Sequence, residues 1–204
     1  MFNLISIDRH RLKTDGEGVT SLIGLAGCPL SCEYCINKEY LKTVKVKQIT
    51  PYQLLERVML DYCYYIGTGG GLTFGGGESL LHIDEIIEYM KINPEGISVN
   101  VETSMNVDIS DEKLRALMEG LKEAIIDIKT LDNELYMKYT GIDNKKVLKN
   151  LSKIVELGFQ DKCKIRIPII PKYKDINTAH EEAEKIKAMG YKNIDVFEYR
   201  IFDK

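Results

Sequence analysis

The stretch Gly27-Cys28-Pro29-Leu30-Ser31-Cys32-Glu33-Tyr34-Cys35 directly follows the apolar run Leu22–Leu25, the first of several runs that predict strands. Its three cysteines are separated by three and then two residues. One loop with this spacing can present thiolates to three corners of a cubane, and thiolates are the usual ligands of iron–sulfur clusters. A zinc site usually has four protein ligands, and no Cys or His stands at the usual offset to be the fourth. The open position is typical of a catalytic metal site, with a zinc knuckle closed by a distant residue as the alternative.

Strands and helices are predicted to alternate along the rest of the chain. Thr50-Pro51-Tyr52-Gln53 has the form of a capping box with proline at the first helical position, and an apolar stripe of helical spacing follows it. A unit of strand and helix that recurs about six times implies parallel strands with right-handed crossovers. The later candidate strands are 72–74, 98–101, 124–128, 164–167 and 194–199, with 3–9 as an added edge strand. The other candidate helices are 82–90, 110–118, 145–157 and 178–189. The positions where helix C-caps belong are occupied by Gly120, Gly158 and Gly190.

The length of the chain limits the architecture. A complete eight-unit barrel usually needs about 250 residues, and this chain has 204. We therefore expect one domain, residues 1–204, folded as a partial (β/α)6 TIM-like barrel. An open doubly wound sheet is the competing architecture.

Composition excludes some classes of function. The net charge is −3, which disfavours a nucleic-acid polymer as the main partner, since phosphate binding usually requires basic excess. No apolar run reaches membrane-spanning length and no signal-peptide pattern opens the chain, so we expect a cytoplasmic protein without a membrane partner. The two cysteines outside the loop, Cys63 and Cys163, lie on apolar patterns and are expected to be buried structural residues.

Polar side chains recur at every second position near the C-terminal ends of three candidate strands. Side chains alternate between the faces of a sheet, and a fully buried parallel strand should be apolar on both faces. We therefore expect a polar inner face at the strand ends where α/β proteins place ligands; the alternative is that these residues only reach solvent. The residues that share this face are Ser98, Asn100 and Glu102, then Asp127 and Lys129, then Lys164 and Arg166.

A glycine turn, Gly75-Gly76-Gly77-Glu78, follows the candidate strand 72–74. Glycines at a strand end let the backbone approach a ligand closely. Glu78 could accept hydrogen bonds from an ammonium group. Glycine turns are common, and this one lacks the lysine of a phosphate-binding loop.

The cysteine spacing with Tyr34 just before Cys35, followed later by Gly-Gly-Glu, resembles the radical S-adenosylmethionine (SAM) superfamily. The resemblance implies that Cys28, Cys32 and Cys35 hold a [4Fe–4S] cluster whose free iron chelates the amino and carboxylate groups of SAM. Reductive cleavage then gives methionine and a 5′-deoxyadenosyl radical, which abstracts hydrogen from a substrate.

Nearly the whole chain resembles the pyruvate formate-lyase activating enzymes, which are glycyl-radical activases. The matching stretches are Thr14-Asp15-Gly16-Glu17-Gly18-Val19, Ile126-Asp127-Ile128-Lys129 and Ile165-Arg166-Ile167-Pro168-Ile169-Ile170-Pro171. This resemblance implies an anaerobic oxidoreductase that takes hydrogen from a backbone glycine of a partner glycyl-radical enzyme. It also implies a flavodoxin or ferredoxin-type electron donor.

Two other functions are the alternatives. One is a radical SAM enzyme that modifies a ribosomal peptide or a small molecule, although peptide-modifying enzymes often carry further cysteine clusters and this sequence has none. The other is an iron–sulfur scaffold or electron carrier, which has no use for the Gly-Gly-Glu motif.

The resemblance also implies roles for single residues. It places Tyr34 and Ile36 beside adenine, and Glu102 at a position where the family has the Asp of a monovalent-cation site. The residues implied to contact SAM elsewhere are Gly76, Gly77 and Glu78 at its methionine end, Asp127, Lys129 and Arg166 at its ribose or carboxylate, and Arg200 in place of a family histidine.

Overall fold

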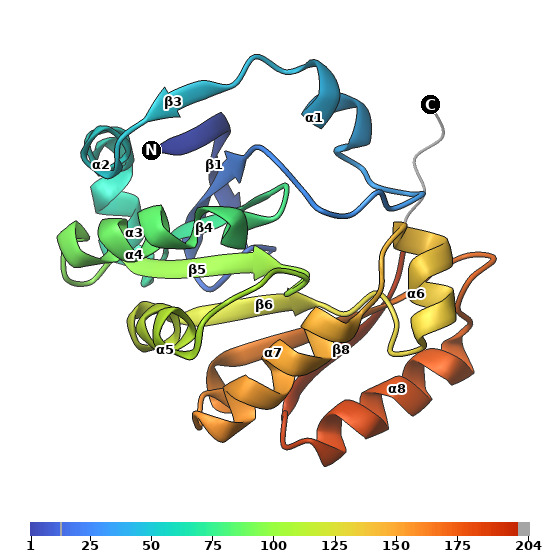
Figure 1. Ribbon diagram of the computed structural model, residues 1–204. Coiled ribbons are helices and arrows are strands. Elements are labelled where there is room, and N and C mark those ends of the chain that lie inside the picture. Colours follow the sequence, from blue (N-terminus) through green and yellow to red (C-terminus); the bar gives the residue numbers. More distant parts are fainter. Residues whose placement is uncertain (13, 200–204) are drawn as a thin grey trace.

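The computed structural model describes residues 1–12 and 14–199, and the strands among them form one sheet (Figure 1). The strands pair in the order β3-β1-β2-β4-β5-β6-β7-β8. Their bounds are β1 Phe2–Leu12, β2 Val19–Leu25, β3 Lys47–Ile49, β4 Gly71–Gly76, β5 Ser98–Thr103, β6 Glu123–Asp127, β7 Cys163–Ile169 and β8 Asn193–Glu198.

Six of these strands, from β2 through β8 without β3, pair in parallel and in chain order. A doubly wound sheet would reverse its strand order partway, so the pairing confirms the partial (β/α)6 barrel over that alternative. Within residues 1–12 and 14–199 the sheet ends at β8, which does not pair with β2, so this part of the barrel is open. The order of the strands also places β5, β6 and β7 side by side, which brings their C-terminal ends to one edge.

The N-terminal part of the sheet is larger than expected. The strand predicted at 3–9 exists but runs over Phe2–Leu12 and pairs antiparallel with β2. It is an interior strand, because the short β3 pairs with its other side and takes the edge. The sequence pattern did not predict β3, since two of its three residues are exposed and carry no apolar alternation.

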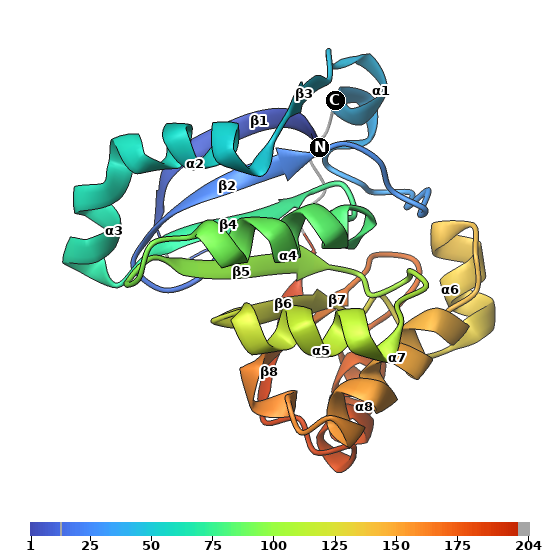
Figure 2. The same ribbon diagram turned by 60° about the vertical axis from the view of Figure 1, so that its left-hand side comes forward.

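Helices cover the outer side of the barrel, with α4 and α5 side by side on it (Figure 2). The predicted capping box opens α2: Gln53 N donates to Thr50 Oγ1 at 3.2 Å, and Thr50 N donates to Gln53 Oε1 at 3.0 Å. The helix bounds are α1 Lys38–Thr43, α2 Pro51–Val58, α3 Tyr62–Thr68, α4 Ile83–Ile92, α5 Asp111–Gly120, α6 Asn133–Thr140, α7 Lys145–Glu156 and α8 Ile176–Ala188, with 3-10 turns η1 Met59–Asp61, η2 Ser79–His82 and η3 Gln160–Lys162.

Two of the three predicted capping glycines have the expected backbone. Gly158 and Gly190 adopt φ of 79° and 104°, the left-handed region that glycine tolerates. Gly120 instead closes α5 without a positive φ. An added Cβ there would lie 2.7 Å from Met90 Sδ, so its small size serves the packing of α5 against α4.

The two cysteines outside the loop have different environments. Cys163 at the start of β7 is buried, as expected. Cys63 is exposed, so the expectation that it is buried was wrong. The helical pattern breaks at η1 and continues as α3, where Tyr65 is the buried residue and Cys63 lies on the outer face.

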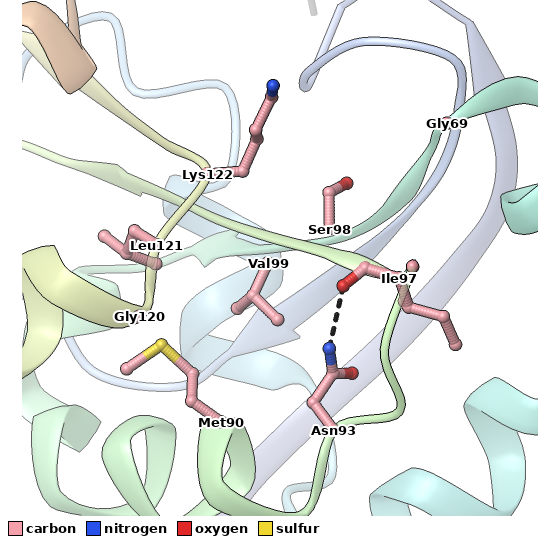
Figure 3. Close-up of a pocket in the computed structure, with 10 residues that line it drawn as sticks. Gly69, Met90, Asn93, Ile97, Ser98, Val99, Gly120, Leu121 and Lys122 are labelled. Carbon is pink, nitrogen blue, oxygen red and sulfur yellow. Dashed lines mark hydrogen bonds between the residues drawn. The ribbon is translucent and has the colours of Figure 1, made fainter.

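A hollow of about 410 Å³ lies at the N-terminal ends of the strands, among Gly69, Ser98, Gly120 and Lys122 (Figure 3). Gly69 precedes β4, Ser98 begins β5 and Lys122 precedes β6. The hollow is therefore at the opposite end of the sheet from the cysteine loop, which follows the C-terminal end of β2. None of the helices in the described part of the chain has the length and apolar character that a membrane crossing needs.

Candidate active site

The cysteine loop connects the C-terminal end of β2 to α1. Its backbone is fixed by α6: Ser31 N donates to Thr140 O at 2.7 Å, and Glu33 N donates to Tyr139 O at 3.2 Å. Both acceptors belong to the last turn of α6, where carbonyl groups have no partner within the helix. The loop is thereby held against a helix that follows β6, although more than 100 residues separate them in sequence.

Tyrosines pack against one side of this loop. The ring centroids of Tyr34, Tyr139 and Tyr173 lie 5.1 to 6.3 Å apart, with tilted or edge-to-face geometry. Tyr199 Oη donates to the Tyr34 carbonyl at 2.6 Å. The predicted adenine neighbour Tyr34 thus has its ring within an aromatic cluster of the protein, while its backbone remains part of the loop.

The three thiols differ in exposure: Cys28 is exposed, Cys35 is half-buried and Cys32 is buried. Although residue Cys28 reaches the surface, desolvation of its sulfur raises its pKa to about 11, with Glu78 and the other two thiols adding to the effect. Burial raises the pKa of Cys32, and Lys129 partly offsets this. Thiolates crowded in this loop therefore need a positively charged group to stabilise them.

A [4Fe–4S] cluster fits that requirement, because its irons supply the positive charge and each thiolate binds a different iron. A mononuclear zinc site needs side chains that converge on one ion. Within residues 1–12 and 14–199, no three Cys, His, Asp or Glu side chains do so. Three thiolates that each bind a different iron are the donor set that such a cluster needs.

The glycine turn lies directly against the start of the cysteine loop. A Cβ on Gly77 would lie 2.1 Å from the Gly27 carbonyl oxygen, so no other residue fits there. Glu78 N donates to that same carbonyl at 2.8 Å. Asn37, just after the cysteines, donates from Nδ2 to the Gly76 carbonyl at 2.9 Å. The two predicted motifs are therefore joined by backbone contacts into one structure.

Beside this contact, Ile36 is 70% exposed. Its side chain is free to contact a ligand, as the resemblance implies for adenine. Gly76 has φ of 91°, and a Cβ there would lie 3.0 Å from Gly24 Cα on β2. Glycine at this position lets β4 end tightly against β2.

The Glu78 carboxylate is buried and bound by the protein itself. Its Oε1 accepts from Thr103 Oγ1 at 2.5 Å and from Leu80 N at 3.2 Å. Its Oε2 accepts from Ser104 N at 2.9 Å and from Ser104 Oγ at 2.6 Å. A carboxylate has about four acceptor positions, and these four bonds use them. In this structure Glu78 ties the end of β4 to the end of β5 through these four bonds.

Four of the predicted inner-face residues, Glu102, Asp127, Lys129 and Arg166, come together across three neighbouring strands. Arg166 Nη1 lies 3.7 Å from Glu102 Oε1, and Arg166 Nε lies 3.7 Å from Asp127 Oδ1. Lys129 Nζ lies 3.3 Å from Asp127 Oδ2. Phe197 on β8 completes the set, because the Arg166 guanidinium carbon lies 4.7 Å from its ring centroid. The alternation of side chains between the two faces of a strand thus predicted that these charged residues would meet. Strand-end residues that only reach solvent would not be expected to contact one another.

Electrostatics in this group depend on burial and on mutual contacts. Burial raises the pKa of Glu102 to about 7, with Asp127 and Asp15 adding to the effect and Arg166 opposing it. Burial alone would lower the pKa of Lys129, but Asp127 and Cys32 raise it above its usual range. Lys129 is thus a permanently charged ammonium between the inner face and the cysteine loop.

The segment before β2 fills the inner face from the other end. A Cβ on Gly16 would lie 2.6 Å from Asn100 Nδ2, and a Cβ on Gly18 would lie 2.6 Å from the Thr68 carbonyl oxygen. Asp15 is buried here, and its carbonyl accepts from Thr73 Oγ1. The stretch that resembles the activases therefore closes the N-terminal half of the inner face.

Several contributors to the site carry no sequence signal. Lys174 and Glu182 form a buried ion pair beside Lys129, and Ser104 binds Glu78. A lysine and a glutamate eight positions apart are unremarkable in sequence, and Ser104 lies in a loop. Arg200, predicted to contact SAM, lies outside the described residues.

The sequence of this chain is similar to those of known proteins over most of its length. A family model described as the Radical SAM superfamily matches residues 22–193. The pyruvate formate-lyase 1-activating enzyme of Escherichia coli K12 is 26% identical over 178 residues, covering 86% of this chain and 72% of the relative. The pyruvate formate-lyase-activating enzyme of Clostridium pasteurianum is 26% identical over 196 residues, covering 91% and 80%. The (2S)-3-sulfopropanediol dehydratase activating enzyme of Klebsiella oxytoca is 26% identical, covering 86% and 72%.

Solved structures share the fold. Streptococcus suis SuiB bound to S-adenosylmethionine has a TM-score of 0.64 at 17% identity, over 85% of this chain and 38% of its own. Native anSMEcpe with bound AdoMet and Kp18Cys peptide has a TM-score of 0.67 at 17% identity, over 90% of this chain and 51% of its own. The chain thus spans between about a third and a half of the length of these structures. The family model takes in the cysteine loop, the glycine turn and the charged strands alike, and the chain belongs to the radical SAM superfamily.

Proposed function

We propose that this chain is the activating enzyme of a glycyl-radical enzyme, and that it abstracts hydrogen from a backbone glycine of that partner protein. The observation that carries the proposal is the similarity to activating enzymes over 86% to 91% of the chain. Those relatives are named for different partners, one a formate-lyase and one a dehydratase. The feature common to them is activation of an enzyme, which is therefore the role assigned here.

The cysteine loop is the proposed cluster site, with Cys28, Cys32 and Cys35 as ligands. When bound, the reduced [4Fe–4S] cluster supplies the electron that cleaves SAM to methionine and a 5′-deoxyadenosyl radical. Lys129 is placed to stabilise thiolate charge, since it partly offsets the burial that raises the pKa of Cys32. The rings of Tyr139 and Tyr173 pack against Tyr34 on that side of the loop.

The inner face is the proposed binding surface for SAM. Lys129 and Arg166 bring positive charge to a surface that also holds Glu102 and Asp127. Cationic donors of this kind bind a carboxylate, and the carboxylates beside them accept from hydroxyl groups such as those of a ribose. Because Glu78 is occupied by the protein, the glycine turn contributes its backbone, which reaches the site directly beside Gly27.

The proposal also covers the electron donor, the domain organisation and the cellular location of the protein. A flavodoxin or ferredoxin-type protein is the proposed electron donor. We also assign residues 1–204 to one domain and the protein to the cytoplasm, where cysteines stay reduced.

The test uses anaerobically reconstituted protein with SAM and a reductant. Slow formation of 5′-deoxyadenosine is expected without a partner, and faster formation with a glycyl-radical enzyme, accompanied by the electron paramagnetic resonance signal of a glycyl radical. The control is the same partner with its radical glycine changed to alanine, which should give neither effect. Acceleration by a small metabolite or an unrelated peptide, with no response to any glycyl-radical enzyme, would contradict the proposal and favour the alternative function.

A further inference from the structure

Lys174 and Glu182 form an ion pair inside the protein, behind the backbone of Lys129. Lys174 Nζ lies 2.7 Å from Glu182 Oε2, and the two side chains are 0% and 4% exposed. Lys174 ends the tight turn after β7, where its backbone N donates to the Ile170 carbonyl at 2.8 Å. Glu182 lies in the middle of α8. The pair therefore joins the end of one barrel strand to the helix that follows it.

Each member of the pair also binds the segment that follows the neighbouring strand β6. Lys174 Nζ donates to the Lys129 carbonyl oxygen at 2.7 Å. Glu182 Oε1 accepts from Thr130 Oγ1 at 2.5 Å and from Leu131 N at 2.6 Å. Three consecutive residues are thus held by two buried charges, and the first of them is Lys129.

Stability alone does not account for this arrangement. Burying two charges is costly, and an apolar pair of similar volume often serves a fold as well or better. The charged pair instead makes directional hydrogen bonds, and these bonds fix the position of the backbone at residues 129–131. From that backbone the Lys129 side chain extends to Asp127 on the inner face, with Nζ 3.3 Å from Oδ2.

We infer that Lys174 and Glu182 are positioning residues, which hold Lys129 so that its ammonium meets SAM beside the cysteine loop. The inference rests on the proposed binding of SAM by Lys129. Neither member of the pair touches the inner face, and both act through the backbone of residues 129–131.

The test compares three variants by calorimetric titration of SAM into cluster-loaded protein: Lys129→Ala, the pair variant Lys174→Met with Glu182→Leu, and the triple combination. We expect the pair variant to lose about ten-fold to one-hundred-fold in SAM affinity, close to the loss in Lys129→Ala. The triple variant should bind no more weakly than Lys129→Ala, because the pair acts only through that residue. Hydrogen exchange of the Leu131 amide should become faster in the pair variant, measured in protein without SAM.

Lys162→Met is the matched control. Lys162 also donates to backbone carbonyls, those of Met118, Glu119 and Leu121, but at the N-terminal end of the sheet. It should keep the SAM affinity of the unmodified protein. The melting temperature of Lys162→Met shows how much stability is lost when a lysine that binds backbone carbonyl groups is removed.

Two results would overturn the inference: a pair variant that melts at a lower temperature but binds SAM normally, or a triple variant whose loss equals the sum of the separate losses. If the pair variant does not fold, Glu182→Gln replaces it. Its amide has a single oxygen and cannot keep both the Lys174 ion pair and the bonds to Thr130 and Leu131. Glu182→Gln should therefore weaken SAM binding, by less than Lys129→Ala does, and unchanged SAM affinity overturns the inference. Calorimetry needs no partner protein, so this outcome is separate from that of the activase proposal, which is read from the glycyl radical.

Discussion

Arg166 on β7 reaches across β6 to Glu102 on β5, with Nη1 3.7 Å from Oε1. The two strands are not neighbours, so the contact exists only because both side chains point to the same inner face. Asp127 on the strand between them lies at 3.7 Å from Arg166 Nε. The charged side chains of the inner face therefore interact with one another. Removing the charge of Asp127 or Arg166 should change the pKa of Glu102.

The raised pKa of Glu102 predicts a pH dependence of stability in the cluster-free protein. The pKa is raised from 4.5 to about 7, so between these values the folded protein holds a proton that the unfolded chain has released. Stability should then fall as pH rises through this window. Glu102→Gln cannot titrate and should remove that decline, a relative gain of up to about 3 kcal/mol at pH 8 compared with pH 5.

Urea unfolding at pH 5 and pH 8 measures this effect. The exposed Glu56→Gln is the control and should show the same pH dependence as the unmodified protein. An identical effect of Glu102→Gln at both pH values would show that burial does not perturb this carboxyl group.

The cluster assignment predicts a clear division among the five cysteines. Reconstituted protein should bind about four irons, and Cys28→Ala, Cys32→Ala or Cys35→Ala should each abolish the cluster, because three thiolates are already the minimum set. Cys63→Ala and Cys163→Ala should retain it, since one cysteine lies on an outer helix face and the other is buried at the start of β7. Iron analysis and electron paramagnetic resonance give the answer. Loss of iron in Cys63→Ala with Cys28→Ala unaffected would refute the assignment.

Lys129→Ala and Arg166→Ala should each weaken SAM binding and leave the cluster intact. Loss of a charge-assisted hydrogen bond should cost about 1.5–3 kcal/mol in each case. Lys164→Ala is the matched control, because Lys164 shares a face with Arg166 but lies two residues nearer the N-terminal end of β7. Calorimetric titration decides, and unchanged affinity in both test variants would remove the inner face from the SAM site.

Glu78→Gln tests whether that carboxylate serves the fold or the ligand. The structure predicts that the variant is less stable by about 2–4 kcal/mol, since an amide nitrogen replaces an oxygen that accepts two hydrogen bonds. The exposed Glu88→Gln should have no effect on urea unfolding. A Glu78→Gln protein of normal stability that fails to bind SAM would instead support the role expected from the sequence, a direct bond to the SAM ammonium.

The alternation of side chains between the two faces of a strand explains why the charged residues of the inner face were predictable from the sequence. Strand positions such as Glu102, Asp127 and Arg166 fall on one face by alternation alone, and parallel strands align their C-terminal ends. The role of Glu78 was not predictable in the same way, because its partners Thr103 and Ser104 approach it only once β5 lies beside β4.

Features that depend on tertiary packing were also missed. Cys63 lies on an apolar pattern, but the break at η1 rotates it outward, and no local signal marks that break. Lys174 and Glu182 read as ordinary surface residues of a loop and a helix. Their burial follows from the way the turn after β7 folds over the segment after β6.

The most direct test of the account follows one hydrogen atom. A glycyl-radical partner carrying deuterium at the α-carbon of its radical glycine is incubated anaerobically with reduced enzyme and SAM, and the 5′-deoxyadenosine is analysed by mass spectrometry. If the chain is a glycyl-radical activase, deuterium appears in the 5′-deoxyadenosine together with a glycyl radical in the partner. Deuterium-free 5′-deoxyadenosine from partner-stimulated reactions, or label transferred instead from a small deuterated metabolite, would contradict it.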